Sequence, residues 1–459
     1  MDNLRQIKHL YARACFGLRF EGRKDAEHHS VKKAVKYLFK VSDGNEPISI
    51  VQGNTDYSML IKGDILAKKQ FLQQQRQQEK DLNLAWINKM STTDAQLQEK
   101  MTLFWHNHFA CRTNNALFAQ QLNNIQRSHA LGNFRDLVVE VSKSPAMLEF
   151  LNNQQNHKGH PNENFARELM ELFTIGRGNY TEQDIKESAR AFTGWGFNKD
   201  GEFIMRPFLH DGGQKTFLGK TGNLAGEDII GRLLEQKQTA WFISNKLYKY
   251  LVNEIPDPTH VNAMADVFYQ ANYEIKPLLE YVFTADWFYD DTNMGNMIKS
   301  PVGFLVGLTR QFYISYQRPE VLLEFQRALG QILFYPPNVA GWPGGRNWID
   351  SSSLMYRLKI PSMLLNGGLI DFTGKADPED EAYIATVRNR QTIVNTKVQA
   401  QPNWDKFLKG IPRNLSNMDI AQFILEPLLS ITIQNAARQS TDIKTLAIEL
   451  VSTPEYQLC

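Results

Sequence analysis

Apolar residues recur at helical spacing along almost the whole chain, and this periodicity limits the fold more than any other feature of the sequence. In one stretch, Leu97, Met101, Phe104, Trp105 and His108 follow the pattern i, i+4, i+7, i+8 and i+11, so they share one face of a helix. A row of large apolar side chains on one face has to be buried against other helices. The sequence therefore predicts a mainly α-helical fold, built as one large domain of many packed helices over 1–459.

Four segments need separate interpretation. Residues 64–92 are rich in Gln and lack a continuous apolar stripe, which predicts an exposed helix or a link. Residues 197–220 contain an Asp-Gly turn between mixed apolar runs, which predicts a small β-hairpin followed by a Gly-rich loop. Residues 334–349 carry prolines, glycines and tryptophans, which favour an ordered surface loop over a helix. A C-terminal helical part is expected over 370–459.

Composition and charge exclude several classes of protein. With 42% hydrophobic residues and a net charge of +2, the chain has the composition of a globular protein. Such a balanced charge gives no general electrostatic reason to bind nucleic acid or a membrane surface. The N-terminal residues lack the apolar region of a signal peptide, and no apolar run is long enough to span a membrane. The 3 cysteines form no CxxC pair. These features favour a cytoplasmic, reducing environment.

His106 and His108 are the first candidates for chemistry. On a regular helix, residues two apart lie about 160° from each other around the axis, so they cannot chelate one metal ion. They could converge if the helix ended between them. The alternative is that His108 is a core residue bonded to a backbone carbonyl, while His106 packs at the edge of the core.

Two carboxylates in the segment NENFARELMELF form the second candidate. Asn164, Glu168 and Glu171 follow the pattern i, i+4 and i+7, and Arg167 lies beside them. Two carboxylates one turn apart can hold a divalent metal, or one can act as a base while the other orients it. The alternative is an ordinary solvated helix face with an i, i+4 pair between Arg167 and Glu171. The next helix carries Arg190, which could cover this row and bury it.

The string LHDGGQK supplies the third candidate. His210 and Asp211 are followed by two glycines, which let the backbone approach a ligand, and Lys215 would suit an anionic group. An Asp-Gly turn with an exposed histidine explains the same letters. His106 or His108, Glu168 with Glu171, and His210 with Asp211 together form a candidate His/carboxylate set of ligands for zinc, manganese or iron, although no standard metal motif is present.

Tryptophans beside glycine form a fourth group of candidates. Trp195, Trp342 and Trp348 could stack against a sugar ring, with Arg346 as a polar partner, in a glycan-related role. Tryptophan in a Pro/Gly loop also serves to pin the loop onto the core. The sequence leaves both alternatives open.

Several long strings together resemble a large bacterial family of unknown function, the DUF1800 family. The resemblance extends from RACFGL at 13–18 to SSSLMYRL at 351–358 and beyond. In order, the strings between these two are FWHNHFA, SPAMLEFLNN, NENFARELMELFTIG, YTEQDIKESARAFTGW, HDGGQKTFLG, IKSPVGFL and LGQILFYPPNVAGWPGGRNWI. The resemblance implies a mainly helical fold. It also implies a partner, a sulfatase-like neighbour of the DUF-fifteen-hundred-and-one family that often carries a Tat signal, and hence a periplasmic location by co-export as the alternative to the cytoplasm.

Two hypotheses for function follow. The first is an enzyme with a metal or carboxylate acid/base site, in which Glu168 acts with support from Glu171, Arg167 and His108. The second is a non-catalytic scaffold or binding protein, in which the same polar residues form a structural network. An active site requires these side chains to converge around an open pocket, whereas a structural network is closed and hydrogen-bonded.

Overall fold

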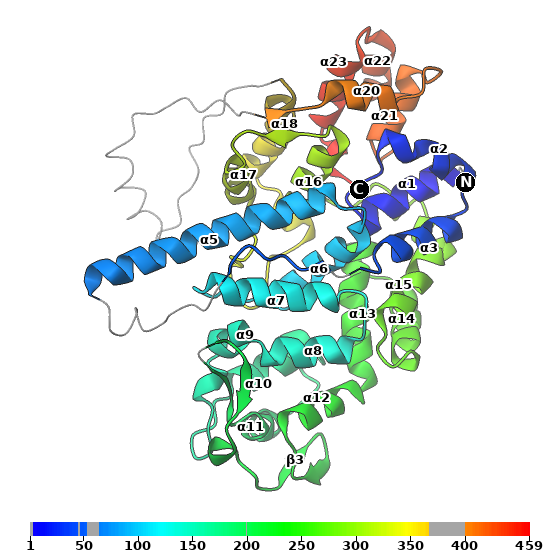
Figure 1. The fold of residues 1–459 in the computed structure, drawn as a ribbon. Coiled ribbons are helices and arrows are strands. Elements are labelled where there is room, and N and C mark those ends of the chain that lie inside the picture. Colours follow the sequence, from blue (N-terminus) through cyan, green and yellow to red (C-terminus); the bar gives the residue numbers. More distant parts are fainter. Residues whose placement is uncertain (1–2, 45, 53–63, 199, 367–399) are drawn as a thin grey trace.

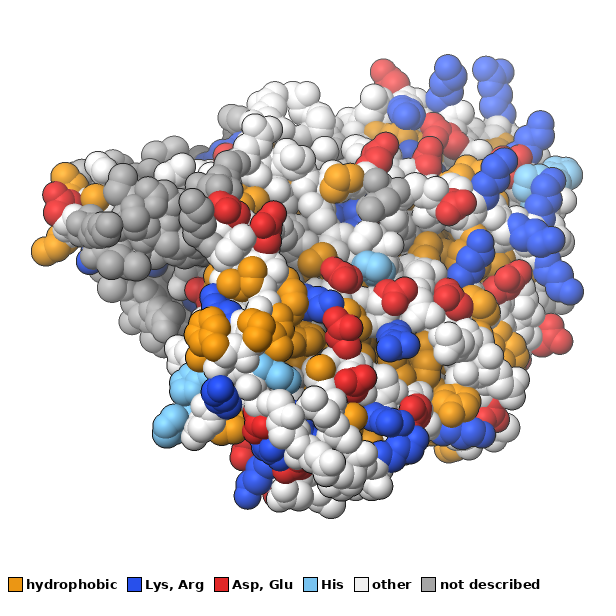
Figure 2. Space-filling model, turned by 60° about the horizontal axis from the view of Figure 1, so that its bottom comes forward, with side chains coloured by type: hydrophobic (Ala, Val, Ile, Leu, Met, Phe, Trp, Pro, Cys, Tyr) orange, Lys and Arg blue, Asp and Glu red, His pale blue; other side chains and the backbone are white. Residues whose placement is uncertain are grey.

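The computed structural model describes residues 3–44, 46–52, 64–198, 200–366 and 400–459 (Figure 1). Over these residues the protein is mainly α-helical, as the sequence predicts, and its sheets each contain two strands. None of the described helices combines the length and apolar character needed to cross a membrane. On the face that Figure 2 shows, Asp and Glu lie among Lys and Arg, in keeping with the near-zero net charge.

The N-terminal part is built around one long helix, α5, which projects from the body of the molecule (Figure 1). Its elements are α1 (Asn3–Ala14), η1 (Phe20–Gly22), α2 (Arg23–His28), α3 (Val31–Val41), α5 (Ile65–Thr92), α6 (Gln96–His108) and α7 (Ala116–Ser128). The Gln-rich segment is therefore one continuous helix, capped by the Asp64 side chain. Its first turns are exposed, whereas Leu82, Trp86 and Met90 in its second half are buried.

The middle part surrounds the predicted charged segment. Its helices are α8 (Phe134–Lys143), α9 (Pro145–Phe150), η2 (Asn153–Gln155), α10 (Asn164–Glu168), the π-helix η3 (Leu169–Phe173), α11 (Glu182–Ala191), η4 (Pro207–Leu209), α12 (Gly226–Leu234), α13 (Lys237–Leu251), α14 (Pro258–Gln270), α15 (Ile275–Thr284) and η5 (Asp286–Tyr289). Strand β1 (Trp195–Phe197) pairs with β2 (Phe203–Met205), and β3 (Lys215–Phe217) pairs with β4 (Lys220–Gly222). The Gly-rich loop thus leads into a second hairpin, whereas the sequence predicts one.

The C-terminal part packs against α1, α5 and the end of α6. Its elements are α16 (Pro301–Gln311), β5 (Ser315–Tyr316), α17 (Val321–Leu329), η6 (Gly345–Trp348), α18 (Ser351–Asn366), β6 (Ala400–Gln401), α20 (Trp404–Gly410), α21 (Asn417–Ile424), α22 (Ile431–Gln439), α23 (Ile443–Val451) and η7 (Glu455–Gln457). Residues 334–349 contain only the short helix η6, in agreement with the predicted loop. Residues 370–399 of the expected C-terminal helical part lie outside the described residues.

Buried side chains form two hydrophobic clusters. The first is built mainly from α1, α3 and α6 to α15, and the second from the second half of α5 together with α16 to α23. Leu4 and Leu18 pack against both clusters. The chain after α1 therefore runs along the junction between the two clusters.

Candidate functional site

His106 is a core residue that joins α6 to the loop after α17. Only 3% of its surface is exposed. Its Nε2 atom accepts a hydrogen bond from the Phe334 N–H at 3.1 Å, and its ring packs against Trp86 and Trp342. Burial lowers the pKa of His106 to about 4, so the imidazole is neutral at neutral pH. The lone pair that a metal would need is used by the backbone.

His108 points to a different neighbour. Its Nε2 donates to the Phe173 carbonyl at 3.0 Å, and its Nδ1 accepts from the Lys246 ammonium at 3.1 Å. Lys246 also donates to the Leu172 carbonyl at 2.9 Å, and burial lowers the pKa of Lys246 to about 8. Because α6 continues through His108, the two histidines do not converge as a helix end between them would have allowed. His108 is instead the core histidine of the alternative interpretation.

The carboxylate segment is only partly α-helical. The Asn162 side chain accepts a hydrogen bond from the Asn164 N–H at 3.0 Å where α10 begins, and the Asn164 side chain donates to the Leu151 carbonyl at 3.3 Å. After Glu168 the chain continues as a π-helix that ends at Phe173, and Gly176 follows it with φ +80°. The sequence predicts a regular helix here, and its apolar spacing gives no sign of the wider turn. π-Helical turns are often found at functional sites.

Arg167 and Glu171, two of the predicted catalytic residues, are held in ion pairs. Arg167 contacts Glu163 at 3.1 Å and Glu182 at 3.0 Å. The Glu171 carboxylate pairs with Arg177, and it also accepts a hydrogen bond from the Tyr180 hydroxyl at 3.2 Å. The predicted i, i+4 pair between Arg167 and Glu171 is absent, because Arg167 pairs with Glu163 in the preceding turn and with Glu182, and Glu171 pairs with Arg177. Both side chains therefore have charged protein partners in this structure.

Glu168 differs from its neighbours. Its carboxylate is half-buried, and among the described residues it makes no hydrogen bond or ion pair. Burial raises the pKa of Glu168, and the nearby charge of Glu171 raises it further. The protonated form of the Glu168 carboxyl is therefore more stable than that of an exposed glutamate.

The loop after η4 forms a closed network with α11. Asp211 receives two hydrogen bonds from Arg190, at 2.7 and 3.2 Å, and Arg190 also binds Glu187 at 2.8 Å. Lys215 is buried and donates to the carbonyls of Asp211 and Gly213, at 2.6 and 3.0 Å. The Arg190 guanidinium lowers the pKa of Asp211 to about 2. We call this set, together with the pairs of Arg167 and Glu171, the α10–α11 network.

The predicted metal ligands are not brought together. His210 hydrogen-bonds through Nδ1 to the Thr193 carbonyl at 2.9 Å, while His106 and His108 have the separate partners described above. Across the described ranges, no group of three or more His, Cys, Asp or Glu side chains is placed to hold a metal ion.

The tryptophans are largely buried. Trp195 packs between Phe192 and Phe203, at ring distances of 4.9 and 5.1 Å. The backbone N–H of Trp342 donates to the Asn107 side chain at 2.7 Å. Both fix a loop to the core, which agrees with the pinning alternative. Arg346 is exposed, and its backbone N–H donates a hydrogen bond to the Glu254 carboxylate at 3.3 Å. Its side chain has no described partner.

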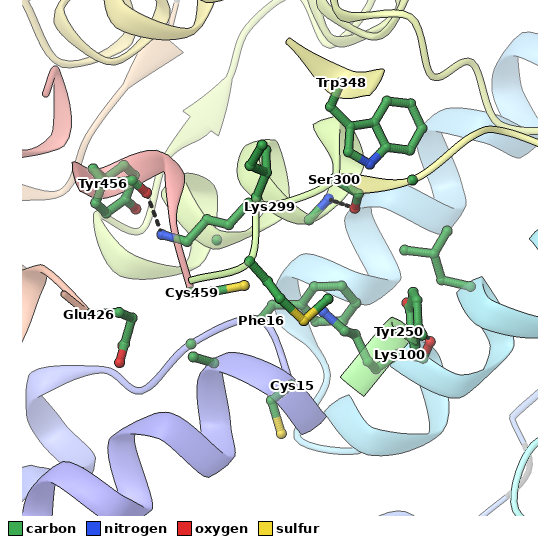
Figure 3. A pocket seen from close by; sticks show the side chains of 18 of the residues that line it. Cys15, Phe16, Lys100, Tyr250, Lys299, Ser300, Trp348, Glu426, Tyr456 and Cys459 are labelled. Carbon is green, nitrogen blue, oxygen red and sulfur yellow. Dashed lines mark hydrogen bonds between the residues drawn. The ribbon is translucent and has the colours of Figure 1, made fainter. Parts of the chain in front are cut away.

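Trp348 instead lines a pocket that the predicted site does not include. This central pocket, of about 140 Å³, lies at the junction of the two hydrophobic clusters. Segments far apart in sequence enclose it, namely 12–19, 100–107, 249–250, 297–311, 344–348 and 423–459 (Figure 3). Ligand sites commonly form at such junctions. The polar side chains that line this pocket form an alternative to the predicted site.

Four cations line the central pocket, namely Arg19, Lys100, Lys249 and Lys299. Lys299 donates to the Tyr456 carbonyl at 2.7 Å and lies 3.8 Å from the centre of its ring (Figure 3). Burial lowers the pKa of Lys299 to about 8.

The acidic side of the pocket is weaker. Glu426 is the single Asp or Glu among the described lining residues, and it lies 3.8 Å from the Lys8 ammonium. Its negative charge is therefore already paired with Lys8, which does not line the pocket. The pocket retains an excess of positive charge.

Sequence reasoning missed the pocket lysines because isolated lysines on helices resemble solvated positions. The sequence strings that carry the family resemblance are the signal that could have located the pocket. Four of them contribute lining residues: RACFGL gives Cys15 to Leu18, FWHNHFA gives Asn107, IKSPVGFL gives Lys299, and LGQILFYPPNVAGWPGGRNWI gives Trp348. Strings spread over more than half of the chain thus meet in one place.

Comparison with known proteins gives one finding. The family model described as "Protein of unknown function (DUF1800)" matches residues 9–458. No curated protein and no solved structure gives a significant match. Because the model covers nearly the whole chain, from the middle of α1 to the end of η7, the protein belongs to the DUF1800 family.

Proposed function

We propose that this protein binds a small organic anion in the central pocket, as a binding protein and not through the predicted carboxylate and histidine site. The observation that carries the proposal is the excess of cations. Arg19, Lys249 and Lys299 line the pocket together with Lys100, and Glu426 is the single Asp or Glu among the described lining residues. Positive charge partly removed from water is stabilised by an anion that enters beside it.

The size of the pocket limits the ligand. A cavity of roughly 150 Å³ accommodates a benzene-sized molecule, whereas pockets for drug-sized ligands measure roughly 300–1,000 Å³. At about 140 Å³, the central pocket suits an anion with few heavy atoms and is too small for a nucleotide. Tyr250 and Trp348 add aromatic surface to its wall. The ligand class that fits is a small carboxylate.

The arrangement of the predicted site supports the same proposal. In the α10–α11 network, the charged groups of Arg167, Glu171, Arg190, Asp211 and Lys215 have protein partners. A network in which these groups are satisfied stabilises the fold and needs no ligand. This is the closed arrangement expected for the second of the two hypotheses.

Calorimetric titration with lactate and with its uncharged analogue lactamide tests the proposal. We expect lactate to bind and lactamide to bind at least about tenfold more weakly, because a hydrogen bond to a charged group contributes about 1.5–3 kcal/mol. The Lys299→Met variant should lose lactate affinity. The matched control is Lys36→Met, which removes the same charge from an exposed position on α3. Equal binding of lactate and lactamide, or equal losses in the two variants, would show that the pocket does not select an anion.

A further inference from the structure

Lys100 is unlike the other enclosed lysines of the protein. Lys8, Lys215, Lys246 and Lys299 each donate to at least one backbone carbonyl. The Lys100 ammonium has no hydrogen-bond acceptor among the described residues. Its contacts are two aromatic rings, Phe16 and Tyr250, each with its centre 5.5 Å from Nζ.

The position of Lys100 in the pocket is central. Figure 3 shows its side chain rising from α6 beside Phe16 and Tyr250, with Lys299 and Cys459 farther along the wall. The pocket gives a small molecule access to the amine, and the surrounding protein limits access of bulk water. A ligand held by the other cations would therefore lie next to the Lys100 nitrogen.

Burial is the main influence on the protonation of Lys100, and it lowers the pKa of this amine. Cys459 and Cys15 act in the opposite sense, and the Arg13 guanidinium makes the smallest contribution, which lowers the pKa. The Cys15 thiol is itself neutral, because burial raises its pKa to about 12. A lysine that is desolvated beside apolar groups and near another cation has the surroundings of the lysines that react with carbonyl compounds.

We infer that Lys100 forms a reversible imine with a small oxo acid bound in the central pocket. The inference rests on the proposed function, because the carboxylate of the oxo acid is the anion that Lys249, Lys299 and Arg19 attract. The Lys100 nitrogen attacks the carbonyl carbon, and a carbon–nitrogen double bond replaces the carbon–oxygen double bond. The two hydrogens of the neutral amine leave with the carbonyl oxygen as one molecule of water, so no oxidant or reductant is consumed.

The dimensions of the pocket agree with this ligand class. A three-carbon oxo acid occupies less space than benzene, which fits a cavity of roughly 150 Å³. The cations in the wall are separate from the amine, so one end of the ligand can be held while the other reacts. Exclusion of bulk water slows hydrolysis of the imine and favours its accumulation.

Borohydride trapping of the full-length protein with pyruvate tests the inference. Borohydride reduces an imine to a stable secondary amine, so intact mass spectrometry should show one reduced pyruvyl group per chain. Peptide mapping should place the group on Lys100. Lactate has the same carboxylate without a carbonyl group, so it should compete with pyruvate and leave no label of its own.

Lys100→Arg separates the two proposals. Arginine does not form this imine, so the variant should lose the label, while the lactate titration of the unaltered protein tests the anion site independently of the imine. Lys36→Met, the exposed control, should keep both properties. Circular dichroism establishes whether Lys100→Arg is folded, and the mapped position of the label in the unaltered protein decides the question if it is not.

The possible failures differ from one another. If lactate and pyruvate bind equally and borohydride leaves no label, the imine is wrong and anion binding stands. Label spread over exposed lysines, or label that persists in folded Lys100→Arg, also overturns the imine. If neither acid binds and no label forms, both the imine and the binding of small carboxylates are wrong.

Discussion

The α10–α11 network and the central pocket contain similar charged side chains but treat them in opposite ways. In the network, Arg190 and Asp211 are joined by two hydrogen bonds, and Lys215 is held by backbone carbonyls. In the pocket, Lys100 has aromatic rings for neighbours and no described hydrogen-bond acceptor. In this protein, charged residues that lie close together in the sequence form a paired structural network. The candidate site instead contains a basic group without a described hydrogen-bond acceptor.

His108→Leu should have the largest effect on stability. The substitution leaves the buried Phe173 carbonyl and one Lys246 hydrogen without their partner, which costs about 3 kcal/mol of unfolding free energy. Urea denaturation measures the change. His28→Leu is the matched control on an exposed helix, where we expect a change within about 0.5 kcal/mol. Equal changes in the two variants would contradict a structural role for His108.

Asp211→Asn should reveal the ion pair through its pH dependence. The folded-state pKa of Asp211 is about 2, below its ordinary value of 3.8, so the stabilisation is present above about pH 4 and is lost as the pH falls toward 2. After allowance for solvent screening, we expect the variant to lose about 1–2 kcal/mol at neutral pH. Denaturation curves at several pH values should converge in acid. Asp291→Asn, at an exposed pair with Arg5, is the control and should change less.

Lys100→Met should act in the opposite direction. Removal of a desolvated amine with no described acceptor should stabilise the protein by about 1 kcal/mol at neutral pH. Because the folded-state pKa is lowered, the unfolded state binds the proton more tightly, so the stability of the unaltered protein should rise as the pH increases above neutral. That rise should be smaller in the variant. A destabilised Lys100→Met would mean that Lys100 is paired like the residues of the network.

Glu168→Gln and Glu171→Gln should give the smallest changes, with opposite signs. The raised pKa of Glu168 means that its charge opposes folding at neutral pH, so the amide should be slightly stabilising. Glu171→Gln removes the contacts with Arg177 and Tyr180, so it should be slightly destabilising. Parallel urea titrations compare the two. Changes of the same sign would contradict the distinction between a paired and an unpaired carboxylate.

Much of the fold could be predicted from the sequence because it follows local rules. Thr181 and Asp184 have the spacing of a capping box and form one, and the stripe from Leu97 to Trp105 is buried as its spacing requires. The π-helix at Leu169–Phe173 could not be predicted, since the apolar spacing fits a regular helix equally well. The second hairpin is not predicted because its turn is Leu218-Gly219, which lacks the Asp-Gly signal of the first.

The candidate site was harder to predict, for a physical reason. Each of the predicted residues stands out in the sequence because of its near neighbours, as His106 does beside His108. The lysines of the pocket come from separate segments between Lys100 and Lys299, and single lysines look alike whether they are solvated or enclosed. The export partner and the compartment implied by the family resemblance stay predictions, because no contact among the described residues bears on them.

The wall of the pocket also sets a condition on when the pocket can form. Met297 and Cys459 exchange two backbone hydrogen bonds, which bring the chain after η7 beside the start of α16 and the end of α1. The pocket therefore has very high contact order and arises only after both clusters have folded and joined. A ligand that binds there favours the joined state by mass action, so it should make the two halves of the molecule unfold together. Ligand binding would then report that folding of the whole chain is complete.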